Sequence, residues 1–224
     1  MPLKLSPETI DVLKNFASIN PNLVINEGSK FSTISEAKNI MASVTVPEKF
    51  DRSFGVYDLN EFISVLGLIT DGVIDLKEDA ALISSGGTSV KYRFANPSVL
   101  TTPQKEIKMP TPDLNILISN DLLTKARKAA SVLGHSVLAI QGTATGAITL
   151  GVIDPKDSSS NEYTVELAEK HDLGKEFSFQ FLIENLKLLS GDYKVAISSK
   201  LISEWVHTTA TVKYFIALEK TSTI

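Results

Sequence analysis

The order of predicted secondary-structure elements occurs twice along this chain of 224 residues. In each half a serine, Ser6 or Ser119, precedes the first helix, and serine is a favoured N-cap residue. Residues 54–66 and 177–189 then share the order strand and helix, and a turn of glycine with aspartate follows each (71–72 and 191–192). A Val-Lys-Tyr tripeptide also recurs near the end of each half. Shared order with little identity is typical of an old duplication, so we predict two similar domains.

Helical periodicity predicts four helices, two in each half. Ser6 caps the first helix, Pro7 suits its first position, where an N–H would have no helical partner, and residues 20–22 (Asn-Pro-Asn) end it. The second helix starts at Asp58, and the fourth covers residues 182–189. The expected apolar faces of the first three are Ile10, Leu13, Phe16 and Ala17; Leu59, Phe62, Ile63, Leu66 and Ile69; and Leu122, Ala126, Ala129 and Leu133.

Short runs rich in β-branched and aromatic residues predict strands between these helices, which gives an α+β fold class. The expected strands are 23–26, 31–35, 40–46 and 53–57, three more between 73 and 94, and then 114–118, 136–141, 146–153, 162–168, 176–181, 193–198, 201–206 and 211–218.

The segment 95–112 differs from both halves, because four prolines lie there among polar residues. These are Pro97, Pro103, Pro110 and Pro112. Such proline spacing favours an extended, rather stiff connector. We therefore predict an N-terminal domain at 1–95, an interdomain connector at 96–112 and a C-terminal domain at 113–224.

The bulk composition excludes several classes of protein. Hydrophobic residues make up 43% of the chain and charged residues 21%, which is typical of a soluble globular protein. Cysteine is absent, which excludes disulfides and thiolate metal sites. No apolar run approaches the roughly 18 residues that cross a bilayer, and no signal-peptide core follows Lys4. The formal charge of −4 argues against a protein that coats nucleic acid by simple attraction.

The sequence offers no residue set for catalysis, for a cofactor or for a metal ion. His135, His171 and His207 do not lie at metal-ligand spacings. The glycines at 142 and 146 lack the Lys-Ser or Lys-Thr of a phosphate-binding loop. We therefore predict a protein that is not an enzyme and whose function depends on its shape.

Positive charge lies on selected helices. Lys125, Arg127 and Lys128 lie away from the apolar stripe of the third helix, whereas the second carries Asp58 and Glu61. Any amphipathic helix must place polar residues outward, and lysine is a common choice, so charge alone leaves DNA contact open.

A collinear set of motifs spans most of the chain. It comprises 4–6 (Lys-Leu-Ser), 13–20 (Leu-Lys-Asn-Phe-Ala-Ser-Ile-Asn), 57–60 with Phe62, Leu66 and Asp71, 185–187 with 191–195, and 214–219. These stretches resemble the sliding clamps of T-even-type bacteriophages. The octapeptide at 13–20 is quite specific, whereas region 73–175 resembles the family mainly in pattern.

The resemblance implies a DNA-clamp fold, in which two similar domains each place two helices on the inner face and antiparallel sheets outside. Such a chain is expected to form a homotrimeric ring around duplex DNA, to tether the phage DNA polymerase, and to be opened by a clamp loader. Phage late-transcription proteins are further implied partners, a hydrophobic pocket on the C-terminal domain or connector is the implied docking site, and the cytoplasm of the infected bacterium is the implied location.

The resemblance also implies which residues face DNA. Lys4, Lys14 and Lys187 lie in matching stretches, Arg127 matches the basic third helix, and Lys125 and Lys128 follow from helix position. Contacts should go to phosphates, which leaves a ring free to slide. The alternative function is a β-rich phage structural or interaction module that does not bind DNA.

Overall fold

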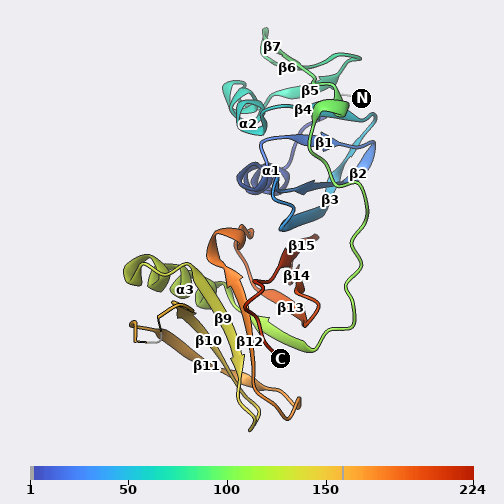
Figure 1. The fold of residues 1–224 in the computed structure, drawn as a ribbon. Helices are drawn as coiled ribbons and strands as arrows, with labels where there is room; N and C mark the ends of the chain where they lie inside the picture. The colour runs from blue at the N-terminus through green and yellow to red at the C-terminus, as the bar shows by residue number, and fades with distance from the viewer. Residues whose placement is uncertain (1–2, 158) are drawn as a thin grey trace. The chain divides into compact units, whose positions relative to one another are not determined.

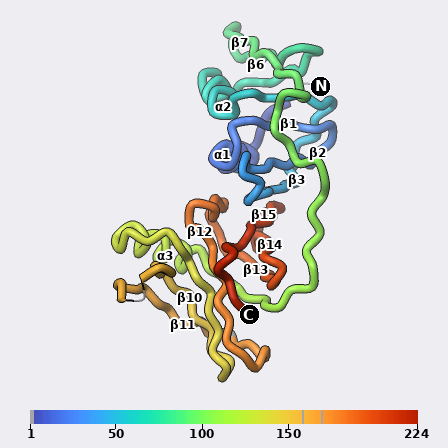
Figure 2. Tube along the Cα trace, in the orientation of Figure 1, coloured from blue at the N-terminus to red at the C-terminus, as the bar shows by residue number. Residues whose placement is uncertain are grey.

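The computed structural model describes residues 3–157 and 159–224, which form two compact units, Met1–Glu106 and Ile107–Ile224. The division falls within the proline-rich segment at 96–112. A short 3₁₀ helix, η1 (Pro97–Val99), is the only helix or strand described between Arg93 and Leu114. Figure 2 shows the rest of this segment as an extended stretch of chain.

Besides η1, the described part of the first unit contains two α-helices and three small groups of antiparallel strands. Its elements are α1 (Pro7–Ile19), β1 (Leu23–Ile25), β2 (Gly28–Ile34), β3 (Ile40–Phe50), β4 (Phe54–Val56), α2 (Leu59–Leu68), β5 (Val73–Leu76), β6 (Ala80–Ser85) and β7 (Thr88–Arg93). Strand β1 pairs with β4, β2 pairs with β3, and β5, β6 and β7 form a meander. Helix α1 packs beside α2 and against β3 (Figure 1).

In its described residues the second unit contains one α-helix and two antiparallel sheets. Its elements are β8 (Leu114–Ile118), α3 (Asn120–Leu133), β9 (Val137–Gly142), β10 (Ala147–Ile153), β11 (Tyr163–Lys170), β12 (Phe177–Leu182), the 3₁₀ helix η2 (Ile183–Asn185), β13 (Tyr193–Ser198), β14 (Ile202–His207) and β15 (Val212–Ala217). One sheet has the order β11-β10-β9-β12, and β8, β13, β14 and β15 follow one another in the other. Helix α3 packs against β10 (Figure 1).

The two units repeat one another element by element, which confirms the predicted pair of similar α+β domains. Strand β8 pairs with β13, and in the first unit its counterpart is Leu3, which exchanges two 2.7 Å backbone hydrogen bonds with Ile74 of β5. The tyrosine of each Val-Lys-Tyr forms a hydrogen bond next to the second helical segment of its unit, but at opposite ends and in opposite directions. The Tyr92 hydroxyl donates to the Asp58 carbonyl before α2, and the Tyr214 hydroxyl accepts from the Leu189 amide after η2.

Aromatic side chains form the centre of each core. In the first unit Phe16, Phe31, Phe50, Phe54 and Phe62 form a continuous chain, with ring centroids 5.8–6.5 Å apart. In the second, Trp205 is fully buried and its ring meets the edges of Phe181 and Tyr193. Edge-to-face pairs such as these add to the stabilisation from area burial.

The buried stripes of α1 and α3 differ from those predicted. Helix α1 buries Thr9, Val12 and Ile19 beside Leu13 and Phe16, whereas Ile10 and Ala17 are half-buried. Helix α3 buries Leu123, Ala126 and Ala130 in place of Leu122, Ala129 and Leu133, because the helix is rotated by about one residue. Apolar residues lie on both sides of each buried stripe. Periodicity alone therefore does not determine which side of the helix faces the core.

The predicted fourth helix at 182–189 is wrong, since only η2 (Ile183–Asn185) forms there. No side chain caps its start, and partners outside the segment satisfy its backbone. The Leu186 carbonyl accepts from Arg127, and the Leu189 carbonyl accepts from the Tyr193 hydroxyl. These hydrogen bonds hold the 3₁₀ turn and the residues after it in a non-helical path.

A buried carboxylate holds the start of α1 to β3. Glu48 is 9% exposed and accepts hydrogen bonds from the Ser6 amide and, at 2.5 Å, from the Thr9 hydroxyl. Burial alone would raise the pKa of Glu48, but these hydrogen bonds outweigh it and the pKa lies below its ordinary value. The ionised carboxylate therefore completes the N-cap that Ser6 begins through its hydroxyl contact to the Thr9 amide.

Replacing Glu48 by Gln should lower the free energy of unfolding at neutral pH by about 1–3 kcal/mol, because a charge-assisted cap is lost. A lowered folded-state pKa stabilises the protein above the unfolded-state pKa, and this stabilisation disappears as the pH falls through the folded-state value. The difference between wild type and E48Q should therefore shrink below about pH 4. Urea denaturation across pH measures it, with the exposed Glu36→Gln as control; a difference independent of pH would contradict the assignment.

Candidate nucleic-acid interface

Helices α1 and α3 each present a polar face to solvent at equivalent positions in their units. On α1 the exposed residues Asp11, Lys14 and Ser18 follow one another at spacings of three or four. On α3 the exposed residues are Asn120, Asp121, Thr124, Lys125, Lys128, Ser131 and Val132. Residues at these spacings share one side of a helix, so each unit offers a lysine-bearing helix face.

Three of the predicted DNA-facing lysines lie beside aspartates. Lys14 lies 3.2 Å from Asp11 and Lys125 lies 2.7 Å from Asp121. Lys4 lies 2.6 Å from Asp71, and the hydrogen bond and charge of Lys4 lower the pKa of that carboxyl. All these side chains are more than half exposed. Exposed ion pairs contribute little to stability because water screens them, so a lysine can exchange its aspartate for a phosphate at low cost.

Lys128 and Lys187 reach solvent in different ways. Lys128 is exposed one turn beyond Lys125 on α3. Lys187 is half-exposed between the buried Leu186 and Leu188, so its side chain leaves the core. It was predicted on a helix but lies just after η2.

Arg127 differs from the five lysines. Its guanidinium is half-buried and donates a 2.6 Å hydrogen bond to the Leu186 carbonyl. Burial lowers its pKa from the ordinary value, yet an arginine stays charged in proteins. At least one of its N–H groups thus forms a hydrogen bond within the second unit.

Helix α2 has a different surface from α1 and α3. It carries no lysine or arginine, and Glu61 is exposed on its first turn. Leu68, at its last turn, is 70% exposed, and Ile63, Val65 and Leu66 are only half-buried. This surface suits contact with protein better than contact with phosphate.

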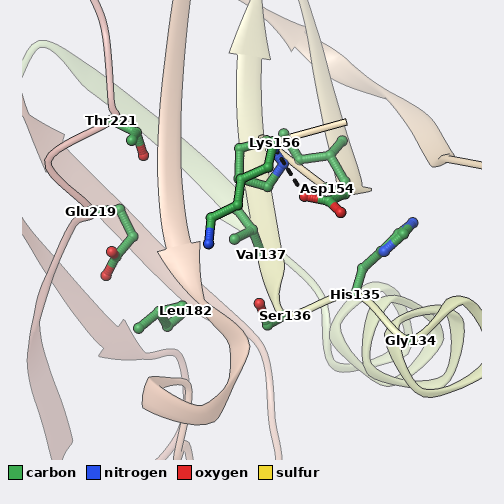
Figure 3. A pocket seen from close by; sticks show the side chains of 11 residues that line it. Gly134, His135, Ser136, Val137, Asp154, Lys156, Leu182, Glu219 and Thr221 are labelled. Atoms are coloured by element: carbon green, nitrogen blue, oxygen red, sulfur yellow. Dashed lines mark hydrogen bonds between the residues drawn. The ribbon is translucent and has the colours of Figure 1, made fainter. Parts of the chain in front are cut away.

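A pocket of ≈ 400 Å³ lies at one end of the sheet that contains β9, β10 and β12. Its apolar lining includes Val137, Ile153 and Leu182, which lie at the ends of these strands. Val137 and Ile153 belong to a small buried cluster, and Leu182 packs against it. His135, Asp154 and Lys156 line one side, and Glu219 and Thr221 line another. Figure 3 shows the Lys156 amine extending toward Glu219 and Leu182. Sequence reasoning missed this pocket, because four distant segments form it.

The stretch after β15 closes this pocket by lying along the edge of β12. The Glu219 amide donates to the Gln180 carbonyl at 2.8 Å, and Ser178 and Thr223 exchange backbone hydrogen bonds of 3.0 and 2.9 Å. The Thr221 hydroxyl also donates to the Gln180 side chain. Figure 2 shows the C-terminal end of the chain beside β12.

The histidines serve local backbone structure. His207 is buried, and its Nδ1 accepts from the amides of Thr209 and Ala210. The Nε2 of His135 lies 2.7 Å from the Asn161 carbonyl. Within residues 3–157 and 159–224, no group of three His, Asp or Glu side chains is arranged to hold a metal ion. Nor is any helix in those ranges long and apolar enough to cross a membrane.

Comparison with known proteins gives consistent results along the chain. The family model described as gp45 sliding clamp, C terminal, matches residues 116–220. The sliding clamp of Vibrio phage KVP40 is 33% identical over 222 residues, covering 97% of this chain and 99% of the relative. The sliding clamp of Escherichia phage RB69 is 28% identical over 228 residues, covering 99% of both chains.

Solved structures at low identity show the same fold. PCNA from Thermococcus kodakaraensis superposes with a TM-score of 0.71 at 13% identity, covering 98% of this chain and 99% of that one. The Helicobacter pylori beta clamp gives a TM-score of 0.70 at 10% identity, covering 96% of this chain and 64% of that one. Together with the extended identity to phage relatives, this shows that the chain belongs to the sliding-clamp family of T-even-type bacteriophages, the processivity factors of phage DNA replication.

Proposed function

We propose that this chain forms a homotrimeric ring that encircles duplex DNA and tethers the phage replicative polymerase. The observation that carries the proposal is the equivalence of the two units, each with one exposed, lysine-bearing helix face on α1 or α3. Closed rings repeat one set of contacts around an axis, and two similar units in each of three chains provide six similar segments. The relatives from phages KVP40 and RB69 are sliding clamps, which agrees with this role.

The inner wall of the proposed ring comprises the faces of α1 and α3, with Lys4, Lys14, Lys125, Lys128 and Lys187 directed at phosphates. A ring holds DNA by enclosing it, so a net charge of −4 is no obstacle. At physiological salt the lysines act over about 8 Å, which permits contact through water. Since phosphates carry no sequence information, the ring slides.

Partners act on this ring from outside. A clamp loader opens and closes it with its own ATP hydrolysis, so the chain needs no catalytic residues, and phage late-transcription proteins are further partners. A polymerase that dissociates stays at high effective concentration and rebinds before it diffuses away. The setting is the cytoplasm of the infected bacterium, where phage DNA is copied.

The subunit contact is proposed to join β7 of one chain to β11 of the next. Each lies at the edge of its sheet, where unpaired backbone groups invite another strand. On β11, Tyr163, Val165 and Leu167 alternate with exposed residues and are themselves only half-buried. Leu68 on α2 and Val132 on α3 are 70% and 77% exposed, and we propose that the contact covers them.

The pocket between Lys156 and Glu219 is the proposed docking site for the tails of the polymerase and clamp loader. Its apolar residues Val137, Ile153 and Leu182 can receive a hydrophobic side chain, while charged groups on both sides fix the direction of an extended peptide.

Changing Lys14, Lys125 and Lys128 together to Glu should shorten the products of primer extension by the cognate polymerase at least several-fold, because the lining becomes repulsive. The folded state should be retained, since all three side chains are exposed. The matched control reverses the exposed Lys49 and Lys200, which lie on β3 and in the β13–β14 turn, and should leave product length unchanged. Unaltered processivity of the triple variant would exclude the assigned lining.

Replacing Leu68 by Asp should convert trimer to monomer at micromolar concentration, because a buried, unpaired carboxylate is costly. Light scattering should give three times the mass of one chain for wild type and a single-chain mass for the variant. Val206→Asp, an exposed apolar position on β14, serves as control and should remain trimeric. A wild type that is monomeric at all accessible concentrations would refute the ring.

Replacing Thr221 by Trp should fill the pocket and weaken binding of a peptide from the polymerase tail at least tenfold, while leaving the trimer intact. Thr221 is exposed, so the larger side chain need not disturb the core. Isothermal titration measures the peptide, and Lys220→Trp, whose side chain does not line the pocket, is the control. Equal affinities of both variants would place the docking site elsewhere.

A further inference from the structure

Lys187 lies at the apex of a three-residue turn. The Leu188 amide donates to the Leu186 carbonyl at 2.9 Å, which is the i→i+2 hydrogen bond of a γ-turn centred on Lys187. Leu186 and Leu188 are buried on either side, at 2% and 8% exposure. The turn thus anchors its two ends in the core and directs the middle side chain outward.

Arg127 holds the carbonyl on which this turn depends. Its Nη2 donates to the Leu186 oxygen at 2.6 Å, so that oxygen accepts both the turn amide and a charged donor. The Leu186 carbonyl and the Lys187 amide belong to one planar peptide unit. Holding this oxygen in place therefore sets the orientation of the peptide plane that joins Leu186 to Lys187.

Two buried tyrosines fix the following residue. The Tyr193 hydroxyl donates to the Leu189 carbonyl at 2.5 Å, and the Leu189 amide donates to the Tyr214 hydroxyl at 3.1 Å. Burial raises the pKa of Tyr214 to about 12, so the hydroxyl stays neutral at working pH. The tyrosines thus bind Leu189, after the turn, whereas Arg127 binds Leu186, at its start.

We infer that Arg127 is a positioning residue: it acts on DNA through Lys187, by holding the Leu186 carbonyl, and does not contact phosphate itself. The inference rests on the proposed DNA lining. It removes Arg127 from the residues that contact DNA and makes it a residue that supports one of them. It also accounts for a guanidinium that is half-buried while its neighbour Lys128 is exposed.

A double-mutant cycle tests this inference on the full-length protein. The variants are Arg127→Gln, Lys187→Gln and the double change, with Lys128→Gln alone and combined with Lys187→Gln as the matched control. Binding of each to a short blunt-ended DNA duplex is followed by fluorescence anisotropy over a range of salt concentrations. Each lost phosphate contact should reduce the slope of log K against log salt by about 0.9.

We expect Arg127→Gln to weaken binding, by no more than Lys187→Gln does, and to have no further effect once Lys187 is gone. Lys128→Gln should reduce the slope in both backgrounds. Hydrogen exchange of the Leu188 amide should quicken in Arg127→Gln and stay unchanged in Lys128→Gln, which reports the turn independently of DNA.

Three results would overturn the inference. A further loss of slope on adding Arg127→Gln to Lys187→Gln would show a direct phosphate contact. Wild-type binding by Arg127→Gln would show that the turn does not need it. If neither Lys187→Gln nor Lys128→Gln changes the slope, the proposed lining itself fails, and the inference fails with it.

Discussion

Burial of one stripe of α1 and of α3 against its own unit is the constraint on which the remaining surface depends. Leu13 and Phe16 anchor α1 within a chain of aromatic rings. Helix α3 instead buries the small residues Ala126 and Ala130, so its backbone can approach the sheet closely. In both cases the opposite face is exposed and carries lysine, and the two helices occupy equivalent positions in their units.

Much of the fold could be predicted from local signals. The caps at Ser6, Asp58 and Ser119 and the breaks at Pro21 and Gly134 mark helix ends, because capping needs only neighbouring residues. Gly134 takes the left-handed conformation, φ 72°, which closes α3 and favours glycine. Residues near helix ends therefore allowed the start and end of these helices to be predicted from the sequence.

Features that depend on distant partners were not predictable in the same way. Residues 182–189 have the spacing of a helix, yet hydrogen bonds to Arg127, Tyr193 and Tyr214 hold the segment in a non-helical path. The pocket beside Lys156 joins segments far apart in sequence. By contrast, the spacing of Asp11 with Lys14 and of Asp121 with Lys125 is visible in the sequence and would have revealed both ion pairs.

We propose that the chain acts by enclosing DNA, and that its lysines contact phosphates too weakly to hold the duplex in one place. Retention of the clamp on DNA of different topology tests this most directly. After loading by the cognate clamp loader onto a nicked circular DNA, the protein should remain bound through a high-salt wash, because salt screens charges but does not open a ring. Cutting the circle once should release it within minutes. Equal loss from circular and linear DNA in high salt would contradict enclosure and leave only electrostatic binding.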